Sequence, residues 1–228
     1  MNNEITTKRF NTKKMTVLAM FVALSYLCVF VFRFKVQFLS FEMSDIFITI
    51  CGFAFGPISA VGVALAKSLL EMITIADTGI YGAVMNFASS AAFAGTAAII
   101  YKYKKSLGGA LLAMLGAIIT RTVVIIALNI LIIPLYMKCS REVVIGMISS
   151  LLLPFNLVKA FMNAGLVFIL YKPLAGALRN IGVLPAHEEN FALTKKNIFV
   201  MIISALVVIG AIVALVVCLN GNIEWVRK

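Results

Sequence analysis

Residues 149–165 decide the fold: they read SSLLLPFNLVKAFMNAG and open a long apolar segment. Three polar side chains interrupt it, Asn156, Lys159 and Asn163, and on a helix offsets of three and seven place all three on one face. Because a lysine at membrane depth costs about 3 kcal/mol on insertion scales, this face is expected to point into a protein interior or a cavity. The alternative is that Lys159 lies close enough to a membrane surface to reach water. Pro154 fits the first turn of the helix, which places Asn156 and Lys159 near that surface.

The composition is that of a helical membrane protein. Hydrophobic residues make up 62% of the 228 residues and charged residues 13%, whereas soluble domains are about half apolar and about one quarter charged. The net charge of +11 comes from basic residues in short segments between apolar runs. Such a distribution sets membrane orientation. The expected environment is therefore a lipid bilayer, and nucleic acid is not an expected partner.

Seven apolar runs predict seven membrane helices, with the basic N-terminus in the cytoplasm of the cell. The predicted runs are 15–32, 45–55, 57–75, 83–101, 107–136, 149–170 and 198–219. The second run is too short to span a bilayer unaided, so it is expected to be tilted or sheltered by its neighbours. Threading the chain places 33–43, 76–82, 134–148 and the C-terminus outside, and 101–106 and 172–197 inside.

This threading also predicts a division of the chain into five parts. They are a basic cytoplasmic N-terminus (1–14), a six-helix membrane domain (15–175), a polar cytoplasmic linker (176–197), an additional transmembrane helix (198–219) and an outer tail (220–228).

The sequence offers little material for catalysis. His187 is the only histidine, and the four cysteines have no partners at metal-ligand spacing. No GxxxxGK[ST] phosphate-binding loop is present. We therefore expect no catalytic residues, no metal and no cofactor. A membrane enzyme acting on a lipid or prenyl substrate is the rival hypothesis from another class, and turnover by the purified chain would support it.

Charged residues inside the apolar runs are expected to pair in the interior. Lys67 and Glu71 are four residues apart on a predicted helix. Arg121 lies in the middle of the fifth run and needs an interior acid, for which Glu71 is one candidate; the sequence does not choose. Ser44 is the expected N-cap of the second run, followed by Asp45 at the positive end of that helix.

Polar groups from three runs are predicted to meet at the outer face. They are Gly82 and Asn86 in the fourth run, Asn129 in the fifth, and Asn156 and Lys159 in the sixth. Amide side chains both donate and accept hydrogen bonds, which suits a polar heterocycle with carbonyl and N–H edges. Phenylalanine and methionine are available for apolar walls. These features predict an outward-facing binding cavity; the alternative is hydrogen bonding among these amides to join the helices.

Ordered motifs over residues 15–175 give the chain a family resemblance. They are Ser44-Asp45-Ile46 with Gly52 to Pro57, Ala66-Lys67, Gly82 to Phe87, Leu128-Asn129 with Ile133 to Tyr136, and Leu153-Pro154-Phe155-Asn156-Leu157-Val158-Lys159. In this order they resemble the riboflavin-specific substrate-binding (S) components of energy-coupling factor (ECF) transporters.

The resemblance implies an all-α, six-helix membrane bundle that takes riboflavin from the extracellular side as a transported ligand. It also implies docking on an ECF transmembrane coupling subunit and two cytoplasmic ATPase subunits. Binding FMN or another vitamin, or acting as a stand-alone secondary transporter, remains an alternative. Arg121 departs from the expected pattern, since an apolar residue is usual there. The seventh span, 198–219, is additional and could anchor the chain or contact another membrane protein.

The family's functional positions can be carried over residue by residue. Contacts to the flavin ring fall on Asn129, Asn156 and Lys159, with help from the loop at Gly82. Ser40 and Asn86 also match substrate-binding positions. The small residues Ala19 and Ala23, four apart on the first predicted helix, match the strip that contacts the transmembrane partner. From spacing alone, these two alanines equally suit an ordinary apolar helix.

Overall fold

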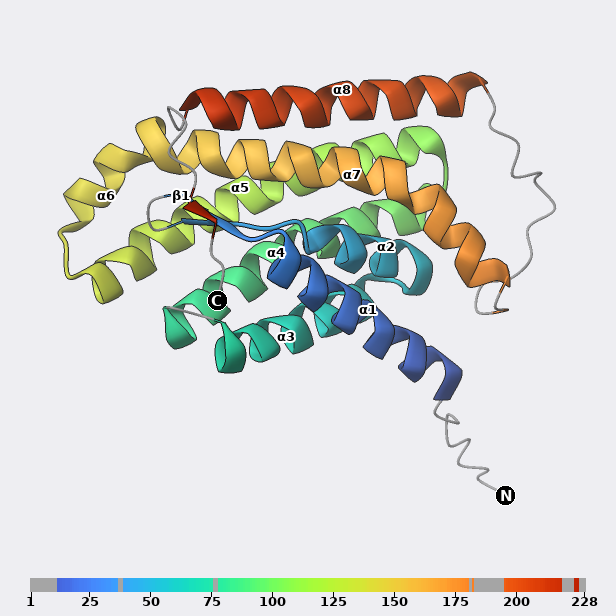
Figure 1. Cartoon of the computed structure of the whole chain (residues 1–228), viewed down its shortest axis with the longest axis horizontal. Helices are drawn as coiled ribbons and strands as arrows, with labels where there is room; N and C mark the ends of the chain where they lie inside the picture. Colours follow the sequence, from blue (N-terminus) through green and yellow to red (C-terminus); the bar gives the residue numbers. More distant parts are fainter. Residues whose placement is uncertain are drawn as a thin grey trace, which may run out of the picture.

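The chain folds into a bundle of long, roughly aligned helices with a small sheet near one end (Figure 1). The computed structural model describes residues 12–36, 39–75, 78–180, 182, 195–218 and 224–225. The helices are α1 (Thr12–Val31), α2 (Asp45–Phe55), α3 (Pro57–Thr74), α4 (Gly79–Tyr103), α5 (Leu107–Met137), α6 (Arg141–Met147), the π-helical turn η1 (Ile148–Leu152), α7 (Leu153–Asn180) and α8 (Lys195–Cys218). The strands are β1 (Phe34–Val36), β2 (Leu39–Phe41) and β3 (Glu224–Trp225).

Five helical segments among the described residues are long and apolar enough to cross a membrane: α1, α3, α4, α5 and the continuous stretch from α6 to α7. Exposed isoleucine, leucine and phenylalanine side chains cover the outside of the bundle, which is where lipid would contact it. The predicted all-α membrane bundle is therefore confirmed.

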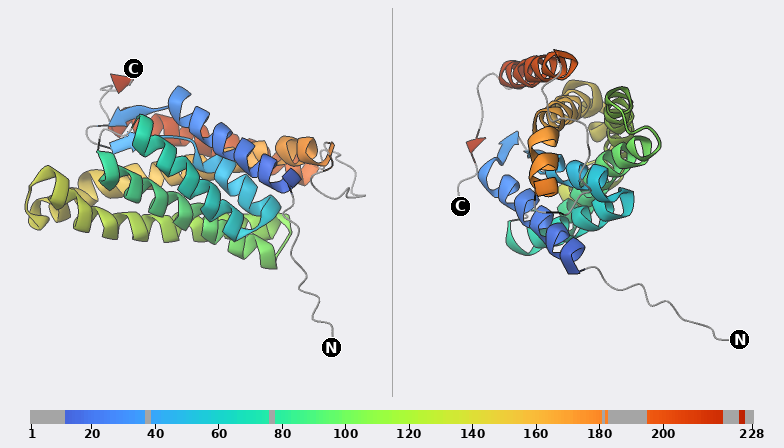
Figure 2. Two further views of the ribbon diagram at one scale, coloured as in Figure 1. Left: turned by 90° about the horizontal axis from the view of Figure 1, so that it is seen from below. Right: turned by 90° about the vertical axis from the view of Figure 1, so that its right-hand side faces the viewer.

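The short helix α2 lies inside the bundle, packed against α1, α3, α4 and α7 (Figure 2). Its side chains Ile48, Ile50 and Cys51 are at most 1% exposed. Gly52 permits this position, since a Cβ there would lie 2.9 Å from the Cβ of Ala98. The expectation that neighbours shelter this short run is correct.

Local signals start several helices where the sequence places them. Gly56 adopts φ +91° between α2 and α3, and Pro57 then opens α3. Ser106 caps α5 by accepting a 3.0 Å hydrogen bond from the backbone N–H of Gly109.

Two predicted helix starts are only partly correct. Ser44 occupies the N-cap position of α2, which begins at Asp45 as predicted, but it has helical backbone angles and makes no side-chain capping bond. Pro154 lies in the first turn of α7, as predicted, but the predicted outer loop before it contains α6 and η1, and these run directly into α7. A π-helical turn precedes Pro154, where its missing N–H removes a regular helical hydrogen bond.

Three short segments, 34–36, 39–41 and 224–225, form a three-stranded antiparallel sheet that the sequence did not suggest. Its order is β2-β1-β3, with Lys35 opposite Ser40 in the hairpin and opposite Glu224 in β3. Phe41 ends the hairpin fully buried, which fixes β2 against the bundle.

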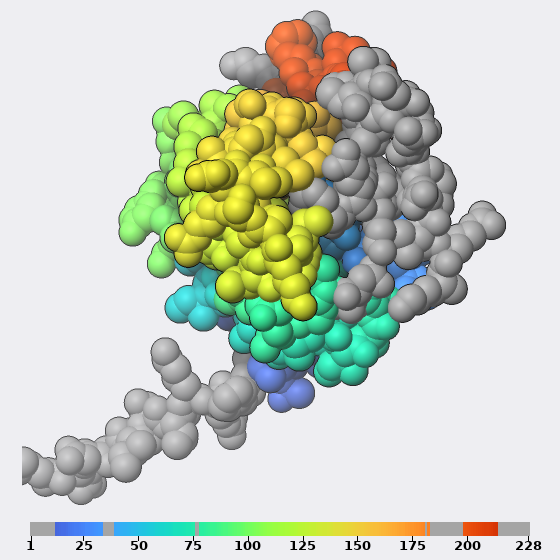
Figure 3. Space-filling model, turned by 90° about the vertical axis from the view of Figure 1, so that its left-hand side faces the viewer, coloured from blue at the N-terminus to red at the C-terminus, as the bar shows by residue number. Residues whose placement is uncertain are grey.

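The predicted ends of the chain are only partly covered. Residues 1–11, most of 181–194 and most of the tail lie outside the described residues, and with them His187. α7 reaches Asn180 and α8 begins at Lys195. Figure 3 views the end of the molecule at which α6 lies.

Candidate ligand-binding pocket

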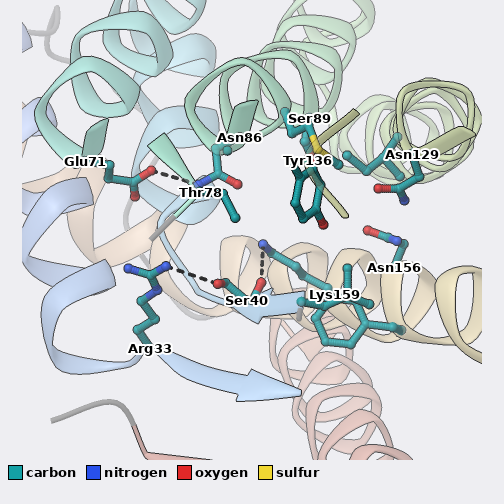
Figure 4. Close-up of a pocket in the computed structure, with 15 residues that line it drawn as sticks. Arg33, Ser40, Glu71, Thr78, Asn86, Ser89, Asn129, Tyr136, Asn156 and Lys159 are labelled. Carbon is teal, nitrogen blue, oxygen red and sulfur yellow. Dashed lines mark hydrogen bonds between the residues drawn. The ribbon is translucent and has the colours of Figure 1, made fainter. Parts of the chain in front are cut away.

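A pocket opens at the end of the bundle that carries the hairpin, and it is built from five parts of the chain (Figure 4). The hairpin, α3, α4, α5 and α7 all contribute side chains. The lining residues are Arg33, Leu39, Ser40, Glu71, Thr78, Gly82, Met85, Asn86, Ser89, Ile125, Asn129, Tyr136, Phe155, Asn156 and Lys159. All six substrate-binding residues proposed from the sequence lie in this one pocket: Ser40, Gly82, Asn86, Asn129, Asn156 and Lys159.

Asn129 is fully buried, yet neither its Oδ1 nor its Nδ2 has a hydrogen-bond partner in the described part of the chain. Leaving such a group unsatisfied costs about 1–3 kcal/mol. Figure 4 shows its amide above that of Asn156, with α5 carrying one and α7 the other. Asn156 donates from Nδ2 to the carbonyl of Leu152 at 2.8 Å. No hydrogen bond joins these two amides in the described structure, so they do not serve to lock the helices together.

Lys159 points inward rather than to a membrane surface. Its Nζ donates to the backbone carbonyl of Ser40 at 3.1 Å and lies 3.6 Å from Oε1 of Glu42. The residue is 5% exposed. The expectation that this face of the helix points into the protein is confirmed. The alternative, in which Lys159 reaches water at a membrane surface, is wrong because its ammonium is bound to the hairpin. Asn163, one turn further on, follows the same face and donates to the carbonyl of Lys159 at 2.9 Å.

Glu42 links the pocket to a buried ion network. Its Oε1 lies 3.0 Å from Nζ of Lys67, and the same nitrogen lies 2.7 Å from Oε1 of Glu71. Glu71 Oε2 then accepts a 3.1 Å hydrogen bond from Asn86. The predicted pairing of Lys67 with Glu71 is confirmed. Burial alone raises the pKa of Glu42, but Lys67 and Lys159 hold it well below its usual range.

Arg121 pairs with Asp45, not with Glu71. Its Nη1 lies 2.6 Å from Oδ2 of Asp45, Ser90 donates to the other carboxylate oxygen, and the guanidinium stacks 5.4 Å from the ring centre of Phe93. Asp45, which was expected to interact with the positive end of its helix, is thus the counter-ion of Arg121. This pair does not line the pocket, so Arg121 is not placed to bind a ligand phosphate.

Several lining residues were not proposed from the sequence. Arg33 donates from Nη1 to the carbonyl of Ile75 at 2.8 Å and from Nη2 to Oγ of Ser40 at 3.2 Å, so it fastens the hairpin to the end of α3. The sequence suggested Glu71 as an ion-pair partner or a proton carrier, but not as a residue of the pocket, although it lies close to the end of its helix. Nothing in the pattern marked Arg33, which lies in a short polar segment between two apolar runs.

Gly82 has a structural reason to be glycine. A Cβ at this position would collide with Oγ1 of Thr78, which also lines the pocket. The first turn of α4 therefore presents backbone and a small hydroxyl to the cavity, which leaves room for a bulky ligand.

Ala19 and Ala23 lie on the exposed side of α1, far from the pocket lining. The view along the bundle in Figure 2 places α1 and α5 on different sides. The two alanines thus form a low strip on the surface where another helix can approach closely.

Comparisons with known proteins agree with one another. The family model "ECF transporter, substrate-specific component" matches residues 13–171. The riboflavin transporter RibU of Staphylococcus aureus (strain TCH60) is 29% identical over 180 residues, which cover 74% of this chain and 94% of that protein. A solved S component of a bacterial ECF transporter superimposes with a TM-score of 0.64 at 28% identity, over 75% of this chain and 99% of that one. Helix α8 and strand β3 lie beyond the residues that the family model matches.

Proposed function

Since the chain belongs to the family of substrate-specific components of ECF transporters, we propose that its pocket captures riboflavin from the extracellular side for uptake into the cell. Members of this family bind substrate for a transporter and are not enzymes. The chain is a multi-pass membrane protein, as its long apolar helices require. Riboflavin is then the transported ligand and not a cofactor.

The observation that carries the proposal is the unsatisfied amide of Asn129 beside Asn156 and Lys159. One edge of the isoalloxazine ring alternates carbonyl oxygens with an N–H, and an amide can pair with both kinds of group. An ammonium on the same side supplies a further donor to a carbonyl. A ligand with that edge would restore the hydrogen bonds that Asn129 lacks and so recover the cost of burying it.

The remaining lining suits the rest of the molecule. Phe155, Tyr136, Met85 and Ile125 provide apolar and aromatic surface for a planar ring. Asn86 and the hydroxyls of Thr78 and Ser89 lie on the other side of the pocket, toward α4, where a polyhydroxylated side chain would find partners.

The charges favour riboflavin over its phosphate ester FMN. Lys159 is held by Glu42, Arg33 donates to the carbonyl of Ile75 and the hydroxyl of Ser40, and Glu71 adds an acid to the pocket lining. A phosphate dianion would lie close to the carboxylate of Glu71, while the ammonium of Lys159 is already neutralised by Glu42. A buried charge without a counter-charge is costly. A neutral ligand disturbs this balance least.

The remaining features of the proposal concern partners and orientation. The exposed strip at Ala19 and Ala23 contacts the ECF transmembrane coupling subunit, and two cytoplasmic ATPase subunits drive release inward. The N-terminus is cytoplasmic because its basic residues follow the charge bias of inner loops. Residues 15–175 are the substrate-binding domain, joined through the linker 176–197 to the extra helix 198–219 and the outer tail 220–228.

The test uses purified full-length protein in detergent. Its visible absorbance is recorded after washing, and protein freed of ligand is then titrated with riboflavin while the quenching of flavin fluorescence is followed. Saturable one-to-one quenching, with FMN competing only at much higher concentration, is the expected result. Absence of quenching by the folded protein would overturn the assignment of riboflavin, and equal competition by FMN would overturn the preference for the neutral ligand.

A further inference from the structure

We infer that α8 is a positioning element of the binding site: it holds one wall of the pocket in place and slows the release of the ligand. The inference rests on the proposed function, because it needs a ligand whose release can be measured. The wall in question consists of Leu39 of the hairpin and Phe155 of α7, which line the pocket, together with Phe41 of the hairpin, which packs behind them; it is called the aromatic wall below.

The first step is the close fit between α8 and α7. Figure 1 shows α8 lying along α7 on the outside of the bundle, and α7 is its main contact. Gly165 of α7 faces α8, where an added Cβ would lie 2.7 Å from Cγ2 of Val208 and 3.0 Å from the carbonyl oxygen of Ser204. Ser204 itself is 5% exposed. Such close backbone approach at a glycine is typical of specific helix pairing in membranes, and a helix that only anchors the chain would not need it.

The second step connects this contact with the pocket. Ala211 is buried in one cluster with Phe41, Phe155 and Met162, and Val208 packs against the same cluster. Phe41 meets Phe155 edge to face, with ring centres 6.0 Å apart. Because Phe155 lines the pocket, α8 lies directly behind the aromatic wall.

The third step is the return of the chain to the hairpin. After α8, strand β3 pairs antiparallel with β1, with Trp225 opposite Phe34. The hairpin is thus held on one side by β3 and on the other by Phe41 in the cluster. The same hairpin supplies Ser40, whose carbonyl receives the hydrogen bond from Lys159.

In each of these contacts, the partner from α8 or β3 lies beyond the residues that the family model matches. The opposite face of α8, including Phe199, Leu206 and Ile209, is 57–64% exposed and suits lipid. Among the described side chains of α8, those that contact the bundle lie on the face toward α7 and the hairpin. Loosening that face would let the aromatic wall move, and the ligand would escape faster while its polar contacts stayed chemically intact.

The experiment compares matched substitutions in the full-length protein. Gly165→Ala inserts a methyl group between α7 and α8, and Gly210→Ala is its control, because a Cβ at Gly210 has nothing within 4 Å. Val208→Ala removes side-chain volume from the cluster, and Val213→Ala, at a residue 55% exposed, removes the same volume from the lipid face. The measured quantities are the association and dissociation rates of riboflavin, by stopped-flow fluorescence, and the thermal midpoint of the unliganded protein.

Gly165→Ala and Val208→Ala are expected to raise the dissociation rate of riboflavin about three- to tenfold, and the two controls to leave it unchanged. Adding Val208→Ala to Gly165→Ala removes the clashing Cγ2, so the double variant should release riboflavin more slowly than Gly165→Ala alone. If the Gly165→Ala protein cannot be purified in a folded form, the dissociation rates of Val208→Ala and Val213→Ala are compared instead, and a faster rate in Val208→Ala supports the inference.

A purely structural role would lower the thermal midpoint and leave the dissociation rate at the level of the controls, and that result would overturn the inference. A wild-type protein that binds no riboflavin would instead overturn the proposed function. The two failures are therefore distinguishable.

Discussion

Arg121 of α5 contacts Asp45 of α2 across 2.6 Å, with both side chains at most 1% exposed. The pair crosses the bundle next to the pocket: Ser90, which donates to Asp45, follows the lining residue Ser89, and Ile125 lies one turn beyond Arg121. The charge of Arg121, in the middle of an apolar helix, is thus neutralised by Asp45, and this buried ion pair lies next to the pocket.

Removing one partner of this pair should be more damaging than removing both. Arg121→Met leaves Asp45 as an uncompensated buried charge and is expected to lower the free energy of unfolding by about 3–5 kcal/mol. The double variant Arg121→Met/Asp45→Asn removes both charges and should recover most of the loss. Thermal unfolding in detergent measures both effects. Arg141→Met, at an exposed residue of α6, is the control for loss of an arginine and should change little.

Asn129→Leu should separate binding from stability. No protein group in the described structure pairs with the amide, so its removal breaks no such bond, and the unliganded protein should keep its thermal midpoint or gain stability. The affinity for riboflavin should fall by about 1–3 kcal/mol, because a polar edge of the ligand loses its partner. Titration by fluorescence quenching gives the affinity. Unchanged affinity would remove Asn129 from the site.

Asn156→Ala and Lys159→Ala should also weaken riboflavin binding by about 1–3 kcal/mol each. They differ from Asn129→Leu in their effect on the stability of the unliganded protein. Lys159→Ala removes a donor to Ser40 and a neighbour of Glu42, so the thermal midpoint should drop as well. Wild-type affinity in a folded Lys159→Ala protein would show that the hairpin contact, and not ligand binding, is the role of this lysine.

The stability that Glu42 contributes should depend on pH in a defined direction. Its pKa is lowered by folding, since Lys67 and Lys159 outweigh the effect of burial. Its contribution is therefore complete above the unfolded pKa of about 4.3 and is lost as the pH falls toward the lower folded value. Glu42→Gln should destabilise the protein at pH 7, and the gap in thermal midpoint between variant and wild type should narrow below about pH 4. A gap that widens at low pH would contradict this assignment.

A bulky residue on the exposed strip of α1 should uncouple capture from uptake. Ala23→Phe adds volume where a partner helix is proposed to approach, and is expected to weaken docking by about 1–3 kcal/mol. Riboflavin binding to the isolated subunit should be unaffected, while uptake by cells that carry the complete transporter should fall. Ala127→Phe, at an exposed position of α5, is the matched control. Equal uptake in both variants would exclude Ala23 from the docking surface.

The sequence predicted the helical bundle well because apolar run length is a strong signal in a membrane protein. It also placed Asn86, Asn129 and Asn156 at one end of the bundle, since threading alternates the ends of successive helices. It could not pair Arg121 with Asp45, because Arg121 lies in the middle of α5 and Asp45 at the start of α2, far apart in the chain, and the rotation of each helix is set by packing. It missed the hairpin because three-residue strands carry almost no periodic signal.

The π-helical turn before α7 has a consequence for how this site can change during evolution. Such a turn holds one residue more than an α-helical turn would, and each residue of an α-helix advances by about 100° around its axis. Deleting a single codon within 148–152 would allow a regular helix and rotate everything after it relative to α6. Unless the short helix α6 took up the whole rotation, Asn156 and Lys159 would then change direction in the pocket without either being replaced. The length of this turn can therefore change during evolution and alter ligand binding, just as substitutions of side chains can.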